Sequence, residues 1–308
     1  MLIHRGLAQL GPPPGGSAVT IGTFDGVHLG HRALIAATVA EARRLGVTPA
    51  LVTWDRHPAA TLRPEAVPPS LTTLGRKVEL IAQAGIGVLA LLAFDDELSS
   101  WPPERFVDEV LVAGLGARAV LVGRGWRFGH RAAGDVELLC SLGAQRGFSA
   151  RAVDLIEGPG GPVSSSRIRA ALAAGDLATA RALMGRPYEI EGVVIPGDGR
   201  GAGLGYPTAN LAVDPALARP PLGIYAGRAR ARGAFHPAAI SIGVNPTFAS
   251  GGGVRVEAYL LDFSGDLYGC DLRLELWARL RAELRFDSVA ALTQQMARDV
   301  AATRALTC

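Results

Sequence analysis

The chain has 308 residues, of which 49% are hydrophobic and 19% charged, so it can form buried cores and is not a disordered chain. Its net charge of +3 is spread along the sequence, and no basic stretch indicates a nucleic-acid partner. The three cysteines lie far apart, and no apolar run reaches the roughly 18 residues of a membrane span. We therefore expect a reduced, cytoplasmic protein of two domains, with neither nucleic acid nor membrane as partner and an open oligomeric state.

The first half of the chain alternates short apolar runs with segments of helical periodicity. Strands are expected at 18–21, 51–53, 86–94, 119–122 and 149–155, and helices at 31–45, 74–84, 103–114 and 135–146. This alternation is typical of an α/β domain with a doubly wound parallel sheet. Ligands of such sheets bind at the carboxyl ends of the strands.

The pattern changes after two short helices at 166–174 and 176–184. Strands with turns between them are expected at 188–195, 223–231, 238–243, 254–262 and 271–277, followed by a helix at 288–305 with Ser288 as its N-cap. This second half favours a small, mainly antiparallel β-barrel or sandwich with a C-terminal helix. We place the boundary after Arg186, which gives domains 1–186 and 187–308.

The turn between the first strand and the first helix reads Gly-Thr-Phe-Asp-Gly-Val-His-Leu-Gly-His from Gly22 to His31. It brings two imidazoles beside the free N–H groups at a helix N-terminus, which favours an anion such as phosphate. Its glycines permit a close approach of the backbone. Two isolated histidines would more often be surface residues, but the whole string at this place favours a phosphate site.

This string resembles the HxGH signature of the nucleotidyltransferase superfamily, in the form GxFDGxHxGH typical of prokaryotic FAD synthetases. Thr53 to Pro58 is similar to the TFxPHP segment of that family, and Ser164 to Arg169 resembles its SSTxIR motif. A run of serines alone would be an ordinary helix N-cap. The resemblance implies a Rossmann-like domain with His28 and His31 as catalytic residues. It also implies the ATP-binding residues Gly22, Phe24, Asp25, Gly26, Gly30, His57, Ser164, Ser165, Ser166 and Arg169.

The segment from Val122 to Gly129 resembles the VGxDFxFG or VGxNFxFG segment of the same family, with two departures. Gly125 stands where the family has Asp or Asn, and Trp126 stands where Phe is usual. The resemblance implies that the polar side chain contacts bound nucleotide or flavin. One contact is therefore missing here, which weakens the inference of adenylylation. Arg76 also stands where the family often has Glu.

A glycine-rich segment links two expected strands of the second half. Its glycines are Gly197, Gly199, Gly201, Gly203 and Gly205. Such a segment allows backbone N–H groups to surround phosphates, although a flexible linker has the same composition. Thr208 and Asn210 follow two residues apart, so that in an extended chain both face the same way and offer oxygen ligands to Mg²⁺. The alternative is a polar turn.

The second half resembles bacterial riboflavin kinase, whose GxGxGxxxGxPTAN signature is nearly complete here. Asn245 to Phe248 matches its NPTF segment, and Val256 to Phe263 matches its strand with an acidic residue. The resemblance implies a mainly antiparallel barrel in which Glu257 is the general base for the riboflavin 5′-hydroxyl. It further implies that the five glycines bind ATP and that Thr208 and Asn210 bind Mg²⁺ and phosphate. A lone strand Glu is otherwise an ordinary solvent-facing residue.

Together the resemblances imply a bifunctional riboflavin kinase and FAD synthetase. ATP is the co-substrate, Mg²⁺ the metal, and riboflavin, FMN and FAD are substrates and products. Two alternatives remain open: a monofunctional riboflavin kinase whose first domain is impaired at Gly125, and a flavin-binding sensor without turnover. Retention of Glu257, Thr208, Asn210, His28 and His31 together argues against the sensor, because binding alone requires no base.

Overall fold

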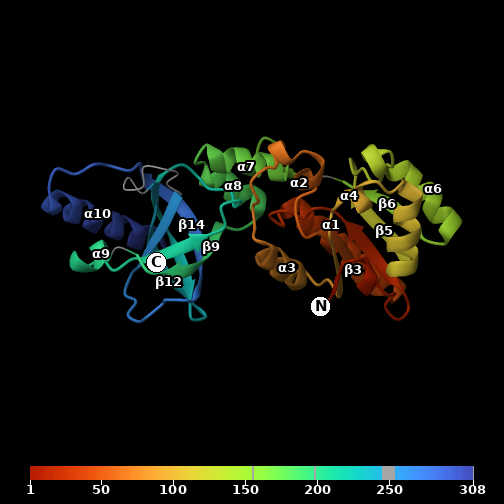
Figure 1. Cartoon of the computed structure of the whole chain (residues 1–308), viewed down its shortest axis with the longest axis horizontal. Helices are drawn as coiled ribbons and strands as arrows, with labels where there is room; N and C mark the ends of the chain where they lie inside the picture. The colour runs from red at the N-terminus through yellow and green to blue at the C-terminus, as the bar shows by residue number, and fades with distance from the viewer. Residues whose placement is uncertain (155, 198, 245–253, 308) are drawn as a thin grey trace. The chain divides into compact units, whose positions relative to one another are not determined.

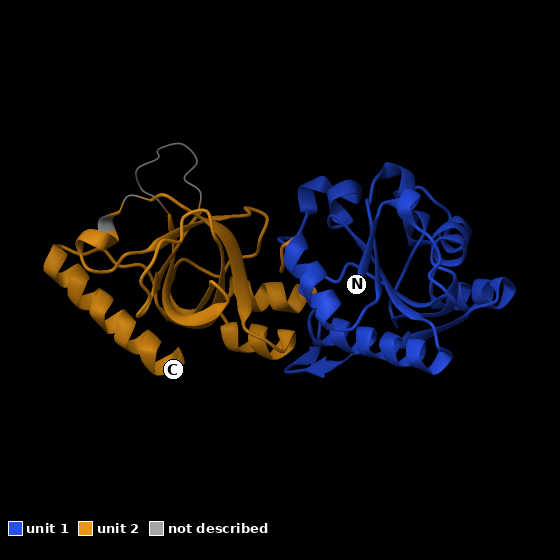
Figure 2. Ribbon diagram, turned by 90° about the horizontal axis from the view of Figure 1, so that it is seen from below, with its two compact units in different colours: residues 1–70, 74–164 blue, residues 71–73, 165–308 orange. Residues whose placement is uncertain are grey.

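The computed structural model of the chain describes residues 1–154, 156–197, 199–244 and 254–307 (Figure 1). Its contacts divide it into two compact units (Figure 2), unit 1 with residues 1–70 and 74–164, and unit 2 with residues 71–73 and 165–308. The domain boundary expected after Arg186 stays a prediction, because these units are defined by contacts and not by independent folding.

Unit 1 contains a six-stranded parallel sheet, as the strand–helix alternation predicts. Its strands are β1 (Leu2–Arg5), β2 (Ser17–Ile21), β3 (Thr48–Trp54), β4 (Val88–Leu92), β5 (Ala117–Gly123) and β6 (Ser149–Val153). Their order is β1-β4-β3-β2-β5-β6, so the direction of the winding reverses between β2 and β5. Doubly wound sheets bind ligands at such a reversal, outside the carboxyl ends of the strands.

The helices of unit 1 are the four predicted ones, close to their expected positions, and two short ones, at 59–62 and 96–99, that were not predicted. They are α1 (Leu29–Leu45), α2 (Ala59–Leu62), α3 (Leu74–Gln83), α4 (Asp96–Ser99), α5 (Pro103–Phe106) and α6 (Val136–Arg146). The helix expected at 103–114 begins as α5 and continues as the π-helical segment η3 (Val107–Gly114). Short 3₁₀ turns η1 (Leu7–Gln9), η2 (Pro64–Ala66) and η4 (His130–Ala132) and the hairpin β7 (Glu157–Gly158) with β8 (Gly161–Pro162) complete the unit.

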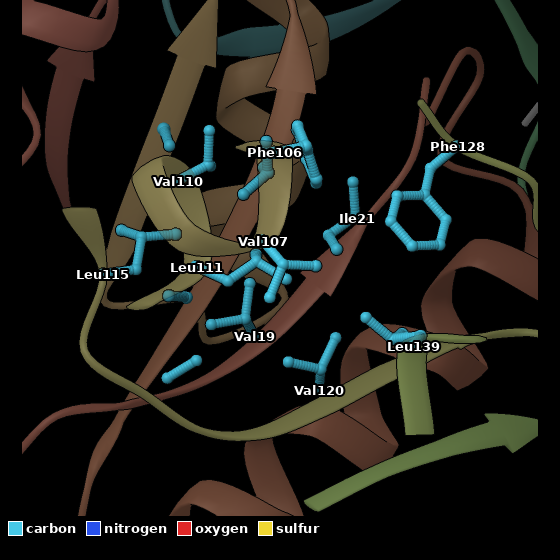
Figure 3. Packing of buried hydrophobic residues seen from close by; sticks show 14 of the residues in the cluster. Val19, Ile21, Phe106, Val107, Val110, Leu111, Leu115, Val120, Phe128 and Leu139 are labelled. Atoms are coloured by element: carbon cyan, nitrogen blue, oxygen red, sulfur yellow. The ribbon is translucent and has the colours of Figure 1, made fainter. Parts of the chain in front are cut away.

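Both faces of the parallel sheet are covered, because alternate strand residues point to opposite sides. On β2, Val19 and Ile21 belong to the core that also contains residues of α5, η3 and α6 (Figure 3). Ala18 belongs to the opposite core, with Ile35 of α1 and Ile81 of α3. The sheet is therefore packed on both faces, and this packing holds the turns at its carboxyl edge in place.

Unit 2 is a closed antiparallel barrel in the order β10-β13-β12-β11-β14-β9. Its strands are β9 (Tyr188–Ile195), β10 (Ala209–Val213), β11 (Gly223–Ala231), β12 (Ala234–Val244), β13 (Val254–Leu260) and β14 (Asp271–Arg281). Its helices are α7 (Ser165–Ala173), α8 (Leu177–Met184), α9 (Arg200–Gly203) and α10 (Val289–Thr307). The barrel and the C-terminal helix confirm the predicted class.

The C-terminal helix α10 begins and docks through specific polar contacts. The Ser288 hydroxyl accepts a hydrogen bond from the Ala291 N–H at 3.2 Å, as expected of an N-cap. Arg281 of β14 pairs with the buried Asp299 at 2.7 Å. Within the described ranges no helix is both long and apolar enough to cross a bilayer, and Cys140 and Cys270 are free thiols.

Candidate active sites

The first candidate site is the turn that follows β2 at the point where the winding of the sheet reverses. Phe24, Asp25 and His28 are buried in this turn. Phe24 and Val27 have φ angles of 51° and 38°, a left-handed conformation that is rare for such side chains. Strained backbone of this kind persists only where its surroundings hold it, and it gathers at functional sites.

His28 caps the helix that carries His31. The His28 Nδ1 accepts a hydrogen bond from the His31 N–H at 3.3 Å, and the two rings stack with centroids 3.6 Å apart and planes at 15°. Because Nδ1 is an acceptor, neutral His28 carries its proton on Nε2. The cap therefore fixes the His28 ring beside the N-terminus of α1, a position that favours an anion.

His31 is held uncharged. Burial, followed by the charges of His28 and Lys77, lowers the pKa of His31 well below its usual value. Its Nδ1 atom is buried and has no hydrogen-bond partner among the described residues. A buried polar atom without a partner is costly, and a bound ligand would relieve that cost.

Glycine occupies several positions of this turn, for a different conformational or steric reason at each. Gly26 has a φ of 83°, which favours glycine. A Cβ on Gly30 would lie 3.2 Å from the His28 ring, so glycine leaves room for the imidazole to lie close to the helix. Gly22 begins the turn directly after β2. The structure thus brings Gly22, Phe24, Asp25, Gly26, His28, Gly30 and His31 together at one edge of the sheet.

The other predicted ATP-binding residues lie outside this turn. The His57 Nδ1 accepts a hydrogen bond from the Ala59 N–H at 3.1 Å and so shapes the start of α2. Ser164 ends unit 1, whereas Ser165, Ser166 and Arg169 belong to α7 in unit 2. Contacts of these residues with the two histidines stay predictions.

Aromatic side chains gather after β5, the strand next to β2. Trp126 and Phe128 stack with centroids 4.6 Å apart, and Phe106 lies 6.1 Å from Phe128. Sequence reasoning did not single out Phe106, since an apolar helix residue reads as core. Gly125 is exposed in the same turn, and a Cβ on it would meet open space. The space for a longer side chain at 125 is therefore present.

The second candidate site is in the barrel, where the glycine-rich segment departs from the expected loop. Part of it forms the short helix α9, so the segment is not an extended linker throughout, and phosphate binding by its backbone stays a prediction. Its turns need φ angles of 69° at Gly199 and 84° at Gly205. A Cβ on Gly197 would overlap the Asn210 amide, and one on Gly201 would overlap the Tyr206 carbonyl. A Cβ on Gly203 would meet open space.

The polar residues predicted for this site do come together. Asn210 of β10 and Glu257 of β13 are direct cross-strand partners. The Thr208 hydroxyl donates to Glu257 Oε2 at 3.3 Å. Along β13 the side chains alternate: Val256 and Ala258 are buried, while Glu257 and its neighbours on the same face are half-buried. The predicted grouping of Thr208, Asn210 and Glu257 is thus observed, and Asn210 lies in a strand, not in a polar turn.

Arg255 is a member of this group that sequence reasoning missed. Its Nε lies 2.9 Å from Asn210 Oδ1 and 2.8 Å from Glu257 Oε1. A signal was present, because residues two apart on a strand share a face. Arg255 thus neutralises the Glu257 carboxylate in part and occupies Asn210 Oδ1.

Two predicted features of the barrel have no observed geometry. The segment from Asn245 to Phe248 lies outside the described residues. In the part of the chain that the structure describes, no three His, Cys, Asp or Glu side chains are grouped as a metal site. Thr208 and Asn210 can also offer oxygen ligands, but Thr and Asn are not among these four residue types.

A histidine pair at a helix N-terminus of a parallel α/β unit, together with a barrel that groups Thr208, Asn210 and a carboxylate, is typical of a transferase acting on phosphate compounds. Comparison with known families agrees with this class. Residues 12–167 match the family model of FAD synthetase, and residues 184–307 match that of riboflavin kinase.

Relatives match over nearly the full chain. A bifunctional riboflavin kinase/FMN adenylyltransferase of Pseudomonas fluorescens is 39% identical, covering 99% of this chain and 98% of its own. The protein of the same name from Escherichia coli K12 is 34% identical over 97% of this chain and 96% of its own. The chain belongs to the family of bifunctional riboflavin kinase/FMN adenylyltransferases.

A solved structure supports the fold. A protein described as a macrolide-efflux protein from Streptococcus pneumoniae has a TM-score of 0.89 and 27% identity, covering 99% of both chains. The parallel sheet unit and the barrel are therefore both found in an experimental structure.

Proposed function

We propose that this chain carries out both reactions of its family: phosphorylation of riboflavin to FMN with ATP, and adenylylation of FMN to FAD with release of pyrophosphate. The observation that carries the proposal is that each unit holds its own group of reactive side chains, the stacked His28 and His31 in one and Glu257 with Thr208 and Asn210 in the other. Its small-molecule partners are then riboflavin, FMN and ATP, and a supply of ATP favours a cytoplasmic location.

Adenylyl transfer needs little covalent help from the protein. A phosphate oxygen of FMN attacks the α-phosphorus of ATP, and the bond from that phosphorus to the pyrophosphate oxygen breaks. The FMN phosphate is already a nucleophile, so the site has to orient it and stabilise charge on the transferring phosphate. The imidazoles of His28 and of the uncharged His31 are groups of the kind this requires, at a helix N-terminus that favours anions.

Phosphorylation of riboflavin needs a proton acceptor. Glu257 takes the proton of the riboflavin 5′-hydroxyl while that oxygen bonds to the γ-phosphorus of ATP, and ADP leaves. The carboxylate is half-buried and keeps lone pairs beside its contacts with Thr208 and Arg255.

Mg²⁺ fits the oxygen atoms of this site. Thr208 and Asn210 would hold it, once Asn210 Oδ1 exchanges its hydrogen bond from Arg255 for the ion. When bound, the ion supplies neutralising charge to the phosphates of ATP.

The products formed from riboflavin test the proposal. The purified chain is incubated with riboflavin, ATP and Mg²⁺, and the flavins are separated by chromatography. FAD supports both activities. FMN alone would indicate a monofunctional kinase, and unchanged riboflavin would indicate a sensor.

Substitution of Gly125 tests the monofunctional alternative. Because the position has open space, Gly125→Asn can restore a polar contact without displacing a neighbour. One added hydrogen bond should lower the KM for FMN or ATP in adenylylation by about 2- to 10-fold. Unchanged steady-state kinetics would reject the view that Gly125 impairs adenylylation. Trp126 or another group would then replace the missing contact.

Two glycines of the barrel should respond differently to alanine. Gly197→Ala pushes against Asn210 and should lower riboflavin phosphorylation by about 10²-fold through its misplacement. Gly203→Ala fills open space and should raise only the KM for ATP, if phosphates use that space. Kinetics of both variants, with FMN adenylylation as control, check this. An unchanged ATP KM in Gly203→Ala would remove Gly203 from the ATP site.

A further inference from the structure

Lys77 is the only lysine in a chain that otherwise carries its side-chain positive charge on arginine. It lies on α3, and its side chain is only 8% exposed. Buried lysines are uncommon, because removing an ammonium group from water is costly unless hydrogen bonds replace the lost hydration. A buried ammonium here therefore points to a specific role.

Three oxygen atoms surround the Lys77 Nζ at the carboxyl ends of β2 and β3. It donates to the Trp54 carbonyl at 2.8 Å, and longer contacts reach the Thr23 carbonyl at 3.4 Å and the Thr53 hydroxyl at 3.5 Å. The Thr53 hydroxyl donates to the same Thr23 carbonyl at 3.0 Å. A compact ammonium suits acceptors that converge on one point, whereas a planar guanidinium does not.

The Thr23 carbonyl is an anchor for the strained part of the histidine turn. Phe24 follows it directly, and Phe24 and Val27 both have positive φ angles. His28 comes next and begins α1 as its N-cap. Since such a backbone relaxes unless it is held, the contact of Lys77 with Thr23 helps to fix where the two imidazoles lie.

The charge of Lys77 also acts on this turn. Burial lowers the pKa of Lys77 to about 8, although Asp25 in the turn and Asp55 after β3 raise it. Burial and then the charge of His28 lower the pKa of His31, and the charge of Lys77 adds a smaller contribution in the same direction. At neutral pH the lysine is therefore cationic and His31 uncharged.

We propose that Lys77 is a positioning residue for adenylyl transfer: its ammonium anchors the strained turn at Thr23 and so fixes where the His28 and His31 imidazoles lie. The role rests on the proposed function of unit 1. It differs from a role in stability alone, because it links the protonation of one lysine to the rate of one of the two reactions.

Lys77→Met in the full chain, which keeps the length of the side chain but not its charge, should lower kcat for FMN adenylylation by about 10- to 100-fold through misplaced imidazoles. Riboflavin phosphorylation should be unchanged and reports that unit 2 is folded, while circular dichroism reports the folding of the whole chain. Thr53→Val is the matched control, because it removes a hydrogen bond to the same Thr23 carbonyl and leaves the ammonium in place. Its effect should be smaller.

The pH dependence separates positioning from stability. A chain labelled with [¹³Cε]lysine gives a single lysine NMR signal, which should titrate near pH 8, as expected for Lys77. Adenylylation should fall over the same pH range, while riboflavin phosphorylation should not. In Lys77→Met this alkaline fall should be absent, and the pKa of His31, assigned with His31→Gln, should rise.

A lysine signal that titrates near its ordinary pKa of about 10.4 would overturn the proposal. So would Lys77→Met with the rate and pH profile of the wild type. If that variant lost both activities, the wild type would test the proposal. Agreement between the pKa of its lysine signal and the pH at which its adenylylation falls would support the proposal, and disagreement would overturn it. A wild-type chain that makes no FAD would refute the proposed function instead, and the effect of Lys77 on His31 would still be measurable.

Discussion

Replacing both His28 and His31 by alanine will abolish FAD formation from supplied FMN and leave FMN formation from riboflavin intact. Each lost donor to the transferring phosphate typically costs about 10²–10³ in rate, so two losses bring adenylylation to the background. The kinase reaction proceeds on the carboxylate group of the barrel and needs neither imidazole. Chromatography of flavins from the two separate substrates measures both rates in one preparation.

The double replacement also removes a helix cap, which has to be separated from the loss of catalysis. The His28 Nδ1 caps α1, and losing an N-cap costs about 1 kcal/mol. His28→Asn keeps a capping oxygen but not the imidazole. It should therefore preserve the thermal stability of the chain and still lose adenylylation. If His28→Asn makes FAD at the wild-type rate, His28 is only a cap.

The protonation of His31 adds a second check on the same site. Because its pKa is lowered, His31 remains neutral as the pH falls through 6.5, where an ordinary histidine gains a proton. Adenylylation should thus show no loss of rate from His31 between pH 7 and about 6. A steep acid fall in that range, absent in His31→Gln, would mean that His31 titrates normally.

Hydrophobic periodicity was sufficient to predict most of the fold, and its failures have physical reasons. β1 was not predicted, because it is a four-residue edge strand that contains His4 and Arg5. β10 was not predicted either, since the Pro-Thr-Ala-Asn segment reads as a turn. Its residues become a strand by pairing with β9, across the glycine-rich segment, and with β13, which lies about 40 residues further along the chain.

The same holds for the sites: features set by neighbouring residues could be predicted, and features that depend on distant segments could not. The histidine turn and the grouping of Thr208 with Glu257 follow from motifs and strand alternation. The burial of Lys77 could not be predicted, because its acceptors at Thr23, Thr53 and Trp54 belong to other segments. A lysine on an amphipathic helix reads as a solvent-facing residue until those strands are placed.

Glu257→Gln should lower the kcat of riboflavin phosphorylation by about 10²–10⁴-fold, the usual contribution of a general base. Glutamine keeps the size of the side chain and can accept a hydrogen bond from Thr208, but it cannot take the proton of the riboflavin hydroxyl. The loss should fall mainly on kcat, since proton transfer occurs in the transition state. Adenylylation of supplied FMN should survive, because its nucleophile needs no deprotonation by this residue.

Variants of the neighbours distinguish a base from a member of an ion pair. Arg255→Met removes the ion pair but keeps the carboxylate, and it should retain far more kinase activity than Glu257→Gln. Thr208→Ala and Asn210→Ala should instead weaken Mg²⁺-dependent nucleotide binding together with the rate. The decisive measurement is kcat for riboflavin in purified Glu257→Gln, with the fold checked by circular dichroism. A value close to wild type, or an equal loss in Arg255→Met, would mean that Glu257 is a structural partner of Arg255 and that the base lies elsewhere.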